Sequence, residues 1–387
     1  MAVLGSLIEQ VRGVSYKPDD LHGTLNEGSI TLLRANNIKD GKLNFNDVVY
    51  VDKKKVSEKQ ILRAGDILIC ASSGSKELVG KAAYVECDLP MTFGAFCKVV
   101  RPKIECPQYI GHFFNSPYYR ERIANSAAGA NINNIRNEHI DVLEIVWPSL
   151  EEQHSAVQVL DKISELIALR KEQLAKLDQL IKSRFIELFG DPLSNDKGWQ
   201  KVLITAVCNA IFGGGTPSKS HPEYFTGSIP WVSPKDMKSS VISDSIDHIT
   251  EEAIAHSTTN LVPANSVLMV IRSGILKHTL PVAINSVPVT INQDMKAFVP
   301  NEAVKTEFLM HYFKAIENDV LSGVRGVTAD NIDFKAFQKR TVIVPPIALQ
   351  EQFAAFVEQT DKSKLAIQQS LDKLELLKKS LMQEYFG

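Results

Sequence analysis

The residues whose types and spacing come closest to a catalytic motif are Asn115-Ser116-Pro117-Tyr118. Adenine methyltransferases hold the amino group of a flipped base with an Asn/Asp-Pro-Pro-Tyr/Phe loop, and this segment differs from that loop at one position. The surrounding residues, YIGHFFNSPYYRERI, predict helix and turn rather than the end of a strand. Short motifs also match often by chance, so we expect no catalysis here.

Two glycine-containing segments could in principle hold phosphate. Gly213-Gly214-Gly215 resembles a phosphate- or cofactor-binding loop, but no βαβ pattern surrounds it, so a flexible turn is expected. The segment from Gly74 to Lys81 has one residue too many for a P-loop and lacks the hydroxyl after its lysine. Nucleotide binding is therefore not predicted.

The cysteines do not predict a metal site or disulfides. Their number is odd, they form no CxxC pair and no histidines lie beside them at ligand spacing, so buried, reduced thiols are expected. The first residues, MAVLGSLIEQVRG, lack a basic segment followed by an apolar one, and no apolar run could span a membrane. We expect a cytoplasmic protein without metal or membrane association.

Net charge limits how the chain could bind nucleic acid. The 387 residues are 44% hydrophobic and 23% charged, which indicates a folded chain of two or three domains. The formal net charge of −2 argues against a DNA binder held by a strongly basic surface. Binding that is shared with a more basic partner remains compatible with it.

The second half of the chain repeats the first at a separation of about 197 to 200 residues. In the tails, Glu152-Gln153 matches Glu351-Gln352 and Phe189-Gly190 matches Phe386-Gly387, which requires a two-residue gap. In the globular parts, LRAGDILICASSG matches VPANSVLMVIRSG. Apolar positions agree while polar positions differ, so the two copies should share one fold and differ at the surface.

Both tails predict long helices because apolar residues recur every seven positions. The first helix should begin at Pro148 with a capping box, Ser149 and Glu152, and should end at Gly190. Neither apolar stripe can be buried by its own helix, so the helices should pack on each other. The packing residues are Leu160, Ile167, Leu174, Ile181 and Leu188 in the first helix and, with Thr360 interrupting, Phe353, Ile367, Leu374 and Leu381 in the second.

Together these patterns predict an α+β protein with two repeated globular domains and two long helices. An internal pseudo-two-fold axis would force the helices into an antiparallel coiled coil. Strands such as GDILICAS and AFCKVV, followed by helical stretches at 107–125 and 304–321, define each globular repeat. The predicted boundaries are 1–147 and 191–344 for the globular domains and 148–190 and 345–387 for the helices.

The pattern resembles the specificity (S) subunit of type I restriction-modification systems over essentially the whole chain. The resemblance is carried by GGGTPSKSHPEYFTGSIPWVSPKDM at 213–237, by GVTADNI and GANINNI, and by the EEQ and QEQ helix openings. The first half departs from it, reading RGVSYK at 12–17 where the second reads GGGTPS.

The resemblance implies that each globular unit is a target recognition domain for half of a split, asymmetric site in double-stranded DNA. The helices would set the spacing and dock two modification subunits, which bind S-adenosylmethionine and methylate adenine N6. Restriction subunits, the translocase and nuclease, would join them. The chain itself would hold no cofactor and catalyse nothing.

Base readout needs hydrogen-bonding side chains at loop ends, chiefly arginine or lysine for guanine and asparagine or glutamine for adenine. Such residues recur at equivalent places in the two copies, and a glycine-rich loop adds candidates for phosphate contact. The candidates are Arg34, Asn36, Lys39, Ser72, Ser73, Lys76, Asn131, Asn133 and Arg136 in the first copy, Thr216, Ser218 and Lys219 in the glycine-rich loop, and Ser233, Lys235, Lys238, Arg272, Ser273, Lys277, Arg325, Thr328 and Asn331 in the second copy.

Two other functions are compatible with this architecture. One is a non-catalytic coiled-coil adaptor that assembles proteins without reading DNA. The other is a self-contained methyltransferase, for which methyl transfer by the purified chain alone would be the discriminating observation.

Overall fold

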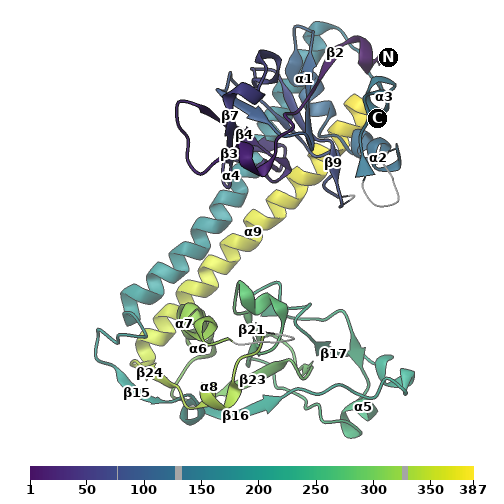
Figure 1. The fold of residues 1–387 in the computed structure, drawn as a ribbon. Helices are drawn as coiled ribbons and strands as arrows, with labels where there is room; N and C mark the ends of the chain where they lie inside the picture. Colours follow the sequence, from purple (N-terminus) through teal and green to yellow (C-terminus); the bar gives the residue numbers. More distant parts are fainter. Residues whose placement is uncertain (76, 127–132, 325–329) are drawn as a thin grey trace. The chain divides into compact units, whose positions relative to one another are not determined.

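The chain divides into two compact units in the computed structural model, which describes residues 1–75, 77–126, 133–324 and 330–387 (Figure 1). Unit 1 comprises residues 1–171 and 368–387, and unit 2 comprises residues 172–367. Both divisions fall inside a long helix, α4 (Leu150–Phe189) or α9 (Ile347–Phe386). Each unit therefore holds one globular repeat and parts of both helices, and the predicted α+β class is confirmed.

Unit 1 is built on two four-stranded sheets and a helical layer. The first sheet is antiparallel, with the order β10 (Ala82–Tyr84), β8 (Ile67–Cys70), β12 (Cys97–Pro102) and β2 (Ile8–Arg12). The second has the order β11 (Met91–Phe93), β4 (Ser29–Leu33), β7 (Val49–Asp52) and β3 (Leu21–His22), and β11 and β4 are parallel. Side chains of β8 alternate between two cores, with Ile67 and Ile69 in one and Leu68 and Cys70 in the other.

Unit 2 repeats this strand order with small changes. Its main sheet has the order β16 (Cys208–Gly213), β23 (Met295–Pro300), β20 (Val267–Val270), β21 (Val282–Asn285) and β18 (Val241–Ile242). A second sheet contains β19 (His248–Ile249), β17 (Ile229–Val232) and β22 (Thr290–Ile291), and β17 and β22 are parallel like β4 and β11. The repeat in sequence is therefore a repeat of fold.

The helical stretch expected after the main sheet is broken in both copies. In unit 1, α1 (Pro107–Phe113) and α2 (Pro117–Ser126) are separated at Asn115-Ser116, before a proline that begins the next helix. In unit 2, α6 (Thr306–Ala315) and α7 (Glu317–Ser322) meet at Ile316. The helix and turn predicted around Asn115 are confirmed, and both stretches are helical as expected.

A short strand closes each globular repeat before its long helix. β14 (Glu144–Ile145) pairs with β1 (Ala2–Val3), and β24 (Thr341–Val344) pairs with β15 (Gln200–Leu203). Each repeat thus joins its own first and last strands.

Helix α4 begins and ends with the predicted signals. The Ser149 N–H donates to Glu152 Oε2 at 2.9 Å, and the Glu152 N–H donates to Ser149 Oγ at 3.3 Å, which makes the capping box. Beyond the last turn, Gly190 has a φ of +76°, the left-handed conformation that commonly ends helices. Both features are confirmed.

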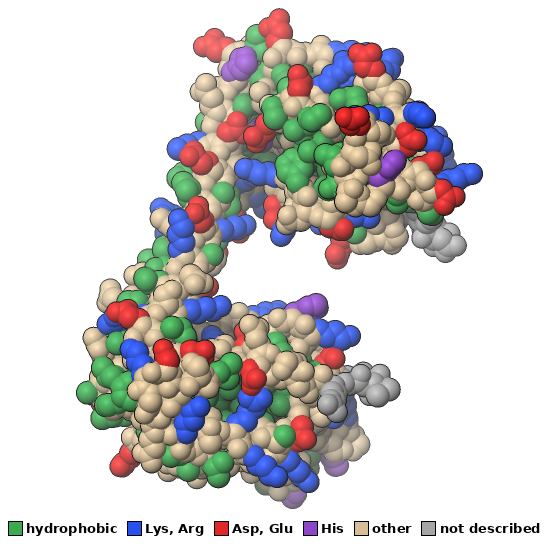
Figure 2. Space-filling model, turned by 60° about the vertical axis from the view of Figure 1, so that its left-hand side comes forward, with side chains coloured by type: hydrophobic (Ala, Val, Ile, Leu, Met, Phe, Trp, Pro, Cys, Tyr) green, Lys and Arg blue, Asp and Glu red, His purple; other side chains and the backbone are tan. Residues whose placement is uncertain are grey.

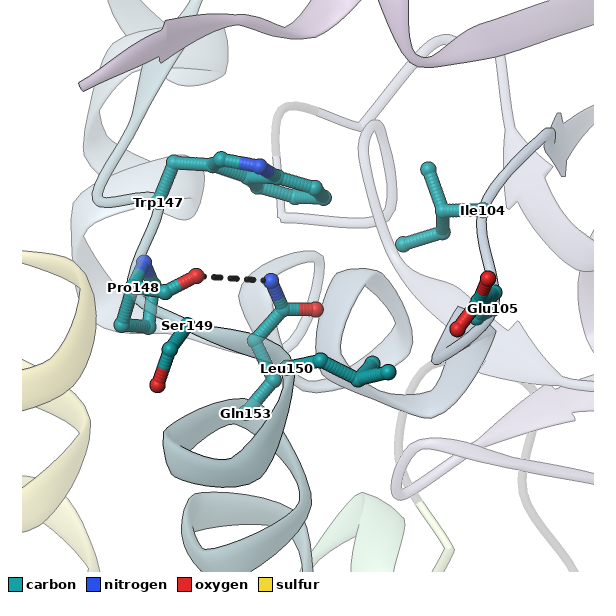
Figure 3. Close-up of a pocket in the computed structure, with 7 residues that line it drawn as sticks. All are labelled: Ile104, Glu105, Trp147, Pro148, Ser149, Leu150 and Gln153. Atoms are coloured by element: carbon teal, nitrogen blue, oxygen red, sulfur yellow. Dashed lines mark hydrogen bonds between the residues drawn. The ribbon is translucent and has the colours of Figure 1, made fainter.

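The two long helices correspond without a gap, because each spans 40 residues and their equivalent residues lie 197 positions apart. Gln153 and Gln350 are equivalent, and both are buried. Gln153 Nε2 donates to Pro148 O at 3.0 Å (Figure 3). Gln350 Nε2 donates to Pro345 O at 2.9 Å. The match of Glu152-Gln153 with Glu351-Gln352 was therefore wrong, since it aligned a buried glutamine with an exposed one.

Within each unit the helices run antiparallel and end on equivalent aromatic contacts. In unit 1, the last turns of α9 lie beside the first turns of α4, and the Phe386 ring lies 5.0 Å from the Tyr109 ring of α1. In unit 2, the last turns of α4 lie beside the first turns of α9, and the Phe189 ring lies 4.8 Å from the Phe308 ring of α6. Each helix thus ends in the core of the other repeat.

The structure places the expected helix-packing residues at graded depths. Leu160, Ile181 and Phe353 are buried, and the other six, Ile167, Leu174, Leu188, Ile367, Leu374 and Leu381, are partly buried. Thr360, expected to interrupt the stripe, is buried too, and its hydroxyl donates to Phe356 O at 2.8 Å.

Not every cysteine is buried as expected. Cys70, Cys97 and Cys106 are buried, Cys208 is partly buried and Cys87 is exposed, because it lies in the turn after β10. All five are free thiols. Burial raises the pKa of the Cys70 thiol, which keeps it protonated.

Candidate nucleic-acid interface

One backbone arrangement carries the central candidate residues in both units. In unit 1, the N–H groups of Ala71 and Ser72 donate to Phe96 O at 2.9 and 3.0 Å. In unit 2, the N–H groups of Ile271 and Arg272 donate to Asp294 O at 2.8 and 3.2 Å. Ser72 therefore corresponds to Arg272, and Phe96 corresponds to Asp294.

A glycine lies against this loop in each unit because the two backbones nearly touch. A Cβ atom at Gly13 would lie 2.1 Å from Gly94 O, and one at Gly214 would lie 1.7 Å from Asn292 O. Neither contact is possible for a larger residue without a backbone shift. The Gly213–Gly215 segment is therefore packed tightly, and the expectation of a flexible turn was wrong.

In unit 2 the structure brings candidates from three segments to the loop 292–294. Thr216 Oγ1 donates to Gln293 Oε1, and Arg272 Nε donates to Asp294 Oδ1 at 2.6 Å. Asn331 pairs with Arg272 in an isolated β-bridge. Two further candidates closely follow Arg272 in the sequence. Ser273 caps the turn Gly274–Lys277, and Lys277 Nζ lies 3.8 Å from Asp330 Oδ2.

In unit 1 the corresponding pairing uses shorter side chains. The strands β9 (Ser72–Ser73) and β13 (Asn133–Asn134) are antiparallel, and Ser72 lies opposite Asn134. Arg136 follows, largely exposed, with its Nη1 3.7 Å from Glu138 Oε1.

A buried lysine, Lys98, contacts the residues on either side of Arg136. Lys98 Nζ donates to Asn137 Oδ1 at 2.7 Å, to Gln10 Oε1 at 2.8 Å and to Ile135 O at 3.4 Å. Burial lowers the pKa of Lys98 to about 8. The equivalent Lys296 instead lies 4.9 Å over the ring of Phe334. The two equivalent lysines thus contact the residues that follow the last candidate segment of each copy, Lys98 by hydrogen bonds and Lys296 through an aromatic ring.

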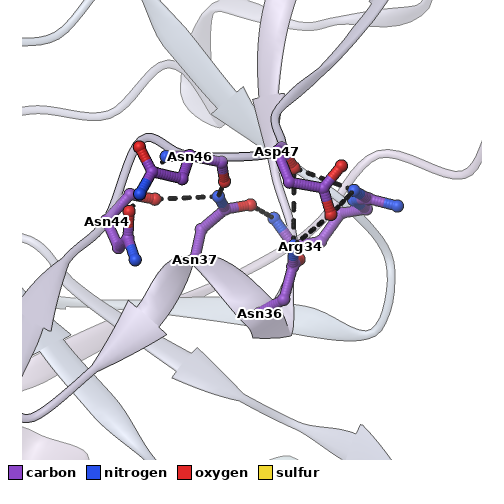
Figure 4. Close-up of polar contacts among 6 residues, drawn as sticks. All are labelled: Arg34, Asn36, Asn37, Asn44, Asn46 and Asp47. Atoms are coloured by element: carbon purple, nitrogen blue, oxygen red, sulfur yellow. Dashed lines mark hydrogen bonds and ion pairs between the residues drawn. The ribbon is translucent and has the colours of Figure 1, made fainter. Parts of the chain in front are cut away.

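The candidates that follow β4 and β17 divide into anchored and exposed residues. Arg34 and Asn36 both donate to Asp47 Oδ2, at 3.0 and 2.8 Å (Figure 4). Ser233 is buried, and its hydroxyl donates to Asp236 Oδ2 at 2.9 Å, so it stabilises its own turn. Asn36 is exposed although it is anchored, and Lys39, Lys235 and Lys238 are exposed too.

The remaining candidates are placed less centrally or not at all. Ser218 Oγ lies 2.7 Å from Ser220 Oγ, and Lys219 is exposed. Asn133 is described only by its backbone pairing with Ser73. Lys76, Asn131, Arg325 and Thr328 lie outside the described residues.

Sequence reasoning missed two residues at the centre of the site, Phe96 and Asp294. Phe96 is 69% exposed, although phenylalanine is usually buried, and Asp294 pairs with Arg272. Aligning Lys98 with Lys296 in the strands AFCKVV and MKAFVP would have placed both at one position. That alignment is the signal that could have identified them.

Charge is mixed rather than concentrated on the surface. Figure 2 shows lysine and arginine side chains interspersed with aspartate and glutamate on the face drawn. The described residues contain no group of three or more His, Cys, Asp or Glu side chains arranged to hold a metal ion. Within the same part of the chain, no helix has the length and apolar character needed to cross a membrane.

Comparison with known proteins points to one family. The family model "Type I restriction modification DNA specificity domain" matches residues 17–179 and 196–377. The chain is 36% identical over 242 residues to the EcoR124I/EcoR124II specificity subunit of Escherichia coli, covering 62% of this chain and 58% of that protein. It is 39% identical over 182 residues to the StySPI specificity subunit of Salmonella potsdam, covering 47% of this chain and 39% of that protein. The chain thus matches roughly two fifths to three fifths of the length of these relatives.

Solved structures share the whole fold. A type I restriction-modification S subunit from M. genitalium matches with a TM-score of 0.59 and 14% identity, covering 100% of this chain and 95% of that one. A chain from a study of complex assembly and conformational transition in the type I R-M system matches with a TM-score of 0.56 and 17% identity, covering 99% and 96%. At these identities the likeness establishes the fold.

Proposed function

The chain belongs to the type I restriction-modification DNA specificity family, and from that premise we propose that it selects the DNA sites of a type I restriction-modification enzyme. Each globular repeat reads one half of a split, asymmetric site in double-stranded DNA. The paired long helices hold the two readers at a set distance, since half-site spacing follows from protein geometry. The domain limits that we propose are 1–147, 148–190, 191–344 and 345–387.

One observation carries the proposal: the same backbone loop presents different side chains in the two repeats. Ser72 with Phe96 in unit 1 corresponds to Arg272 with Asp294 in unit 2. A scaffold that is kept while its exposed side chains change suits two readers of different base sequences. The contacts that we propose for the described residues are made by Lys39, Ser72, Ser73, Arg136, Thr216, Lys219, Lys235, Lys238, Arg272, Lys277 and Asn331.

The proposal assigns the chemistry to partners. Two modification subunits bind S-adenosylmethionine and methylate adenine N6, and restriction subunits join the complex in the cytoplasm. The chain contributes site selection and assembly, without a cofactor or catalytic residues of its own. Its net charge of −2 supports DNA binding that is shared with the modification subunits.

The test is a genome-wide map of methylated adenines in cells that express this chain with its modification subunits. We expect one split motif, and we expect one half of it to change when residues 191–344 are replaced by the equivalent domain of a relative. A complex that assembles but methylates without sequence preference would instead identify a structural adaptor. Methyl transfer by the purified chain alone would contradict the non-catalytic assignment.

The spacing role of the helices has its own test. Four helix-forming residues inserted after Lys171 add about one turn, or roughly 6 Å. Because a base pair rises about 3.4 Å, the spacer should lengthen by about one or two base pairs, with some loss of stability from the altered helix register. The same two half-sites at the original spacing, with activity preserved, would show that the helices do not set the distance.

A further inference from the structure

Arg272 is held in position by a carboxylate that is itself fixed. Arg272 Nε donates to Asp294 Oδ1 at 2.6 Å, and the Arg272 N–H donates to Asp294 O at 3.2 Å. The other carboxylate oxygen of Asp294 accepts from Asn292 Nδ2 at 3.1 Å, and the Asp294 N–H donates to Asn292 Oδ1 at 3.1 Å. The orientation of the guanidinium is thus set before any ligand arrives.

The Arg272 guanidinium is partly exposed. The Arg272 side chain is 47% exposed, and its Nη1 and Nη2 have no hydrogen-bond partner among the described residues. Those two nitrogens form a planar fork that matches two acceptors side by side. In the major groove, guanine O6 and N7 present that pair of acceptors, whereas adenine presents one acceptor and one donor.

Arg34, another arginine of the candidate set, has the opposite arrangement. Arg34 Nη2 donates to Asp47 O at 2.8 Å and to Asp47 Oδ2 at 3.0 Å, so both protons of that nitrogen are used within the protein. Its fork cannot engage two acceptors on a base. Arg34 therefore stabilises the loop 34–47, whereas Arg272 uses only its Nε in the side-chain bonds that it makes to the described residues.

We propose that Arg272 reads a guanine in the half-site of unit 2, with Asp294 as its positioning residue. The proposal rests on the function proposed above. Guanine is specified because only its major-groove edge offers two adjacent acceptors to the fork. Unit 1 carries Ser72 and Phe96 at these positions, so its half-site lacks an equivalent arginine contact.

The proposal is tested by comparing the methylation motifs of variants in the assembled enzyme. The half-site of unit 2, identified by exchanging residues 191–344, should contain a guanine. Arg272→Ala should relax that one position, lowering discrimination for guanine by about 10- to 100-fold while the other positions keep their bases. Asp294→Asn should relax the same position by a smaller factor, because the arginine remains but is less firmly held.

A matched control removes an arginine–aspartate pair elsewhere in unit 2. Arg340 is paired with Asp319, and neither residue is a candidate for DNA contact, so Arg340→Ala should leave the motif unchanged. A guanine-free half-site, or an unchanged motif in Arg272→Ala, would overturn the proposal while the proposed function stands. Absence of any split motif in the wild type would overturn both. Thermal unfolding of each variant excludes misfolding, since a misfolded domain would lose all its base preferences together.

Discussion

The loops 94–96 and 292–294 have the same backbone and opposite side-chain chemistry. Each accepts two N–H bonds from the end of a central strand, and each has a glycine packed against it. At the shared position, unit 1 exposes the apolar ring of Phe96, and unit 2 has a carboxylate that orients Arg272. An apolar group suits a thymine methyl, whereas an oriented arginine suits guanine. If the two loops read DNA as proposed, the shared backbone contacts set where a base is read, and one pair of side chains sets which base is read.

The largest effect should come from the aromatic residues that end the two helices in equivalent ways. Phe189→Ala should lower the stability of unit 2, and Phe386→Ala that of unit 1, each by about 3 to 5 kcal/mol, because both rings are buried among other aromatics. Denaturant unfolding followed by amide exchange in each unit would measure this.

Leu376→Ala is the control, since Leu376 lies on α9 like Phe386 but is exposed. An equal loss of stability in both units from a single aromatic substitution would contradict the expectation that each ring stabilises one unit.

The next effect concerns the glycines that both scaffolds need. Gly13→Ala and Gly214→Ala should each destabilise the protein by about 1 to 3 kcal/mol, since the new Cβ would collide with a backbone carbonyl oxygen. Gly74→Ala and Gly274→Ala are matched controls, because nothing lies within 4 Å of a Cβ at either position. Thermal unfolding of the four variants decides the matter, and similar losses in all four would contradict the close-approach argument.

Periodicity and repetition in the sequence were sufficient for the helices, the antiparallel arrangement and the α+β class. Seven-residue spacing predicts a helix over many turns, so an error at one residue does not matter. The two long helices were aligned wrongly at Glu152 because EEQ at 151–153 resembles QEQ at 350–352. The burial of Gln153, which identifies Gln350 as its equivalent, is not visible in the sequence alone. Asp294, the partner of Arg272, was missed because Lys98 and Lys296 are the only identical residues that align the strands AFCKVV and MKAFVP, too weak a match to fix their register.

A smaller effect is expected from moving the side chains of one repeat into the other. Ser72→Arg combined with Phe96→Asp should give the half-site of unit 1 a new preference for guanine. The free-energy discrimination against other bases should not exceed about 3 kcal/mol. Ser72→Arg alone should give less, because no carboxylate would orient the new arginine. Methylation maps of the single and double variants measure the difference. A double variant no more selective than the single one would show that the loops, despite equal backbones, are not interchangeable.

The smallest effect concerns the response to acid of His311, which is equivalent in position to His112. His112 Nε2 lies 2.8 Å from Asp161 Oδ1, whereas the His311 ring packs edge-on against Phe353 at 5.2 Å. Burial, with the positive charges of Lys314 and Lys364, lowers the pKa of His311 to about 3. In the unfolded chain a histidine has a pKa of about 6.5.

Between these two pKa values the unfolded chain binds a proton at His311 that the folded chain does not bind. The free energy of unfolding of unit 2 should therefore fall as the pH is lowered from about 6.5 toward 3, and above about 6.5 this contribution should vanish. His311→Gln removes the titrating group, so the difference in unfolding free energy between pH 7 and pH 5 should shrink. His112→Gln, the equivalent change in unit 1, should leave the acid response of unit 2 as it is in the wild type. Urea unfolding of the three proteins at both pH values tests this, and an equal acid loss in wild type and His311→Gln would assign the acid sensitivity of unit 2 to other groups.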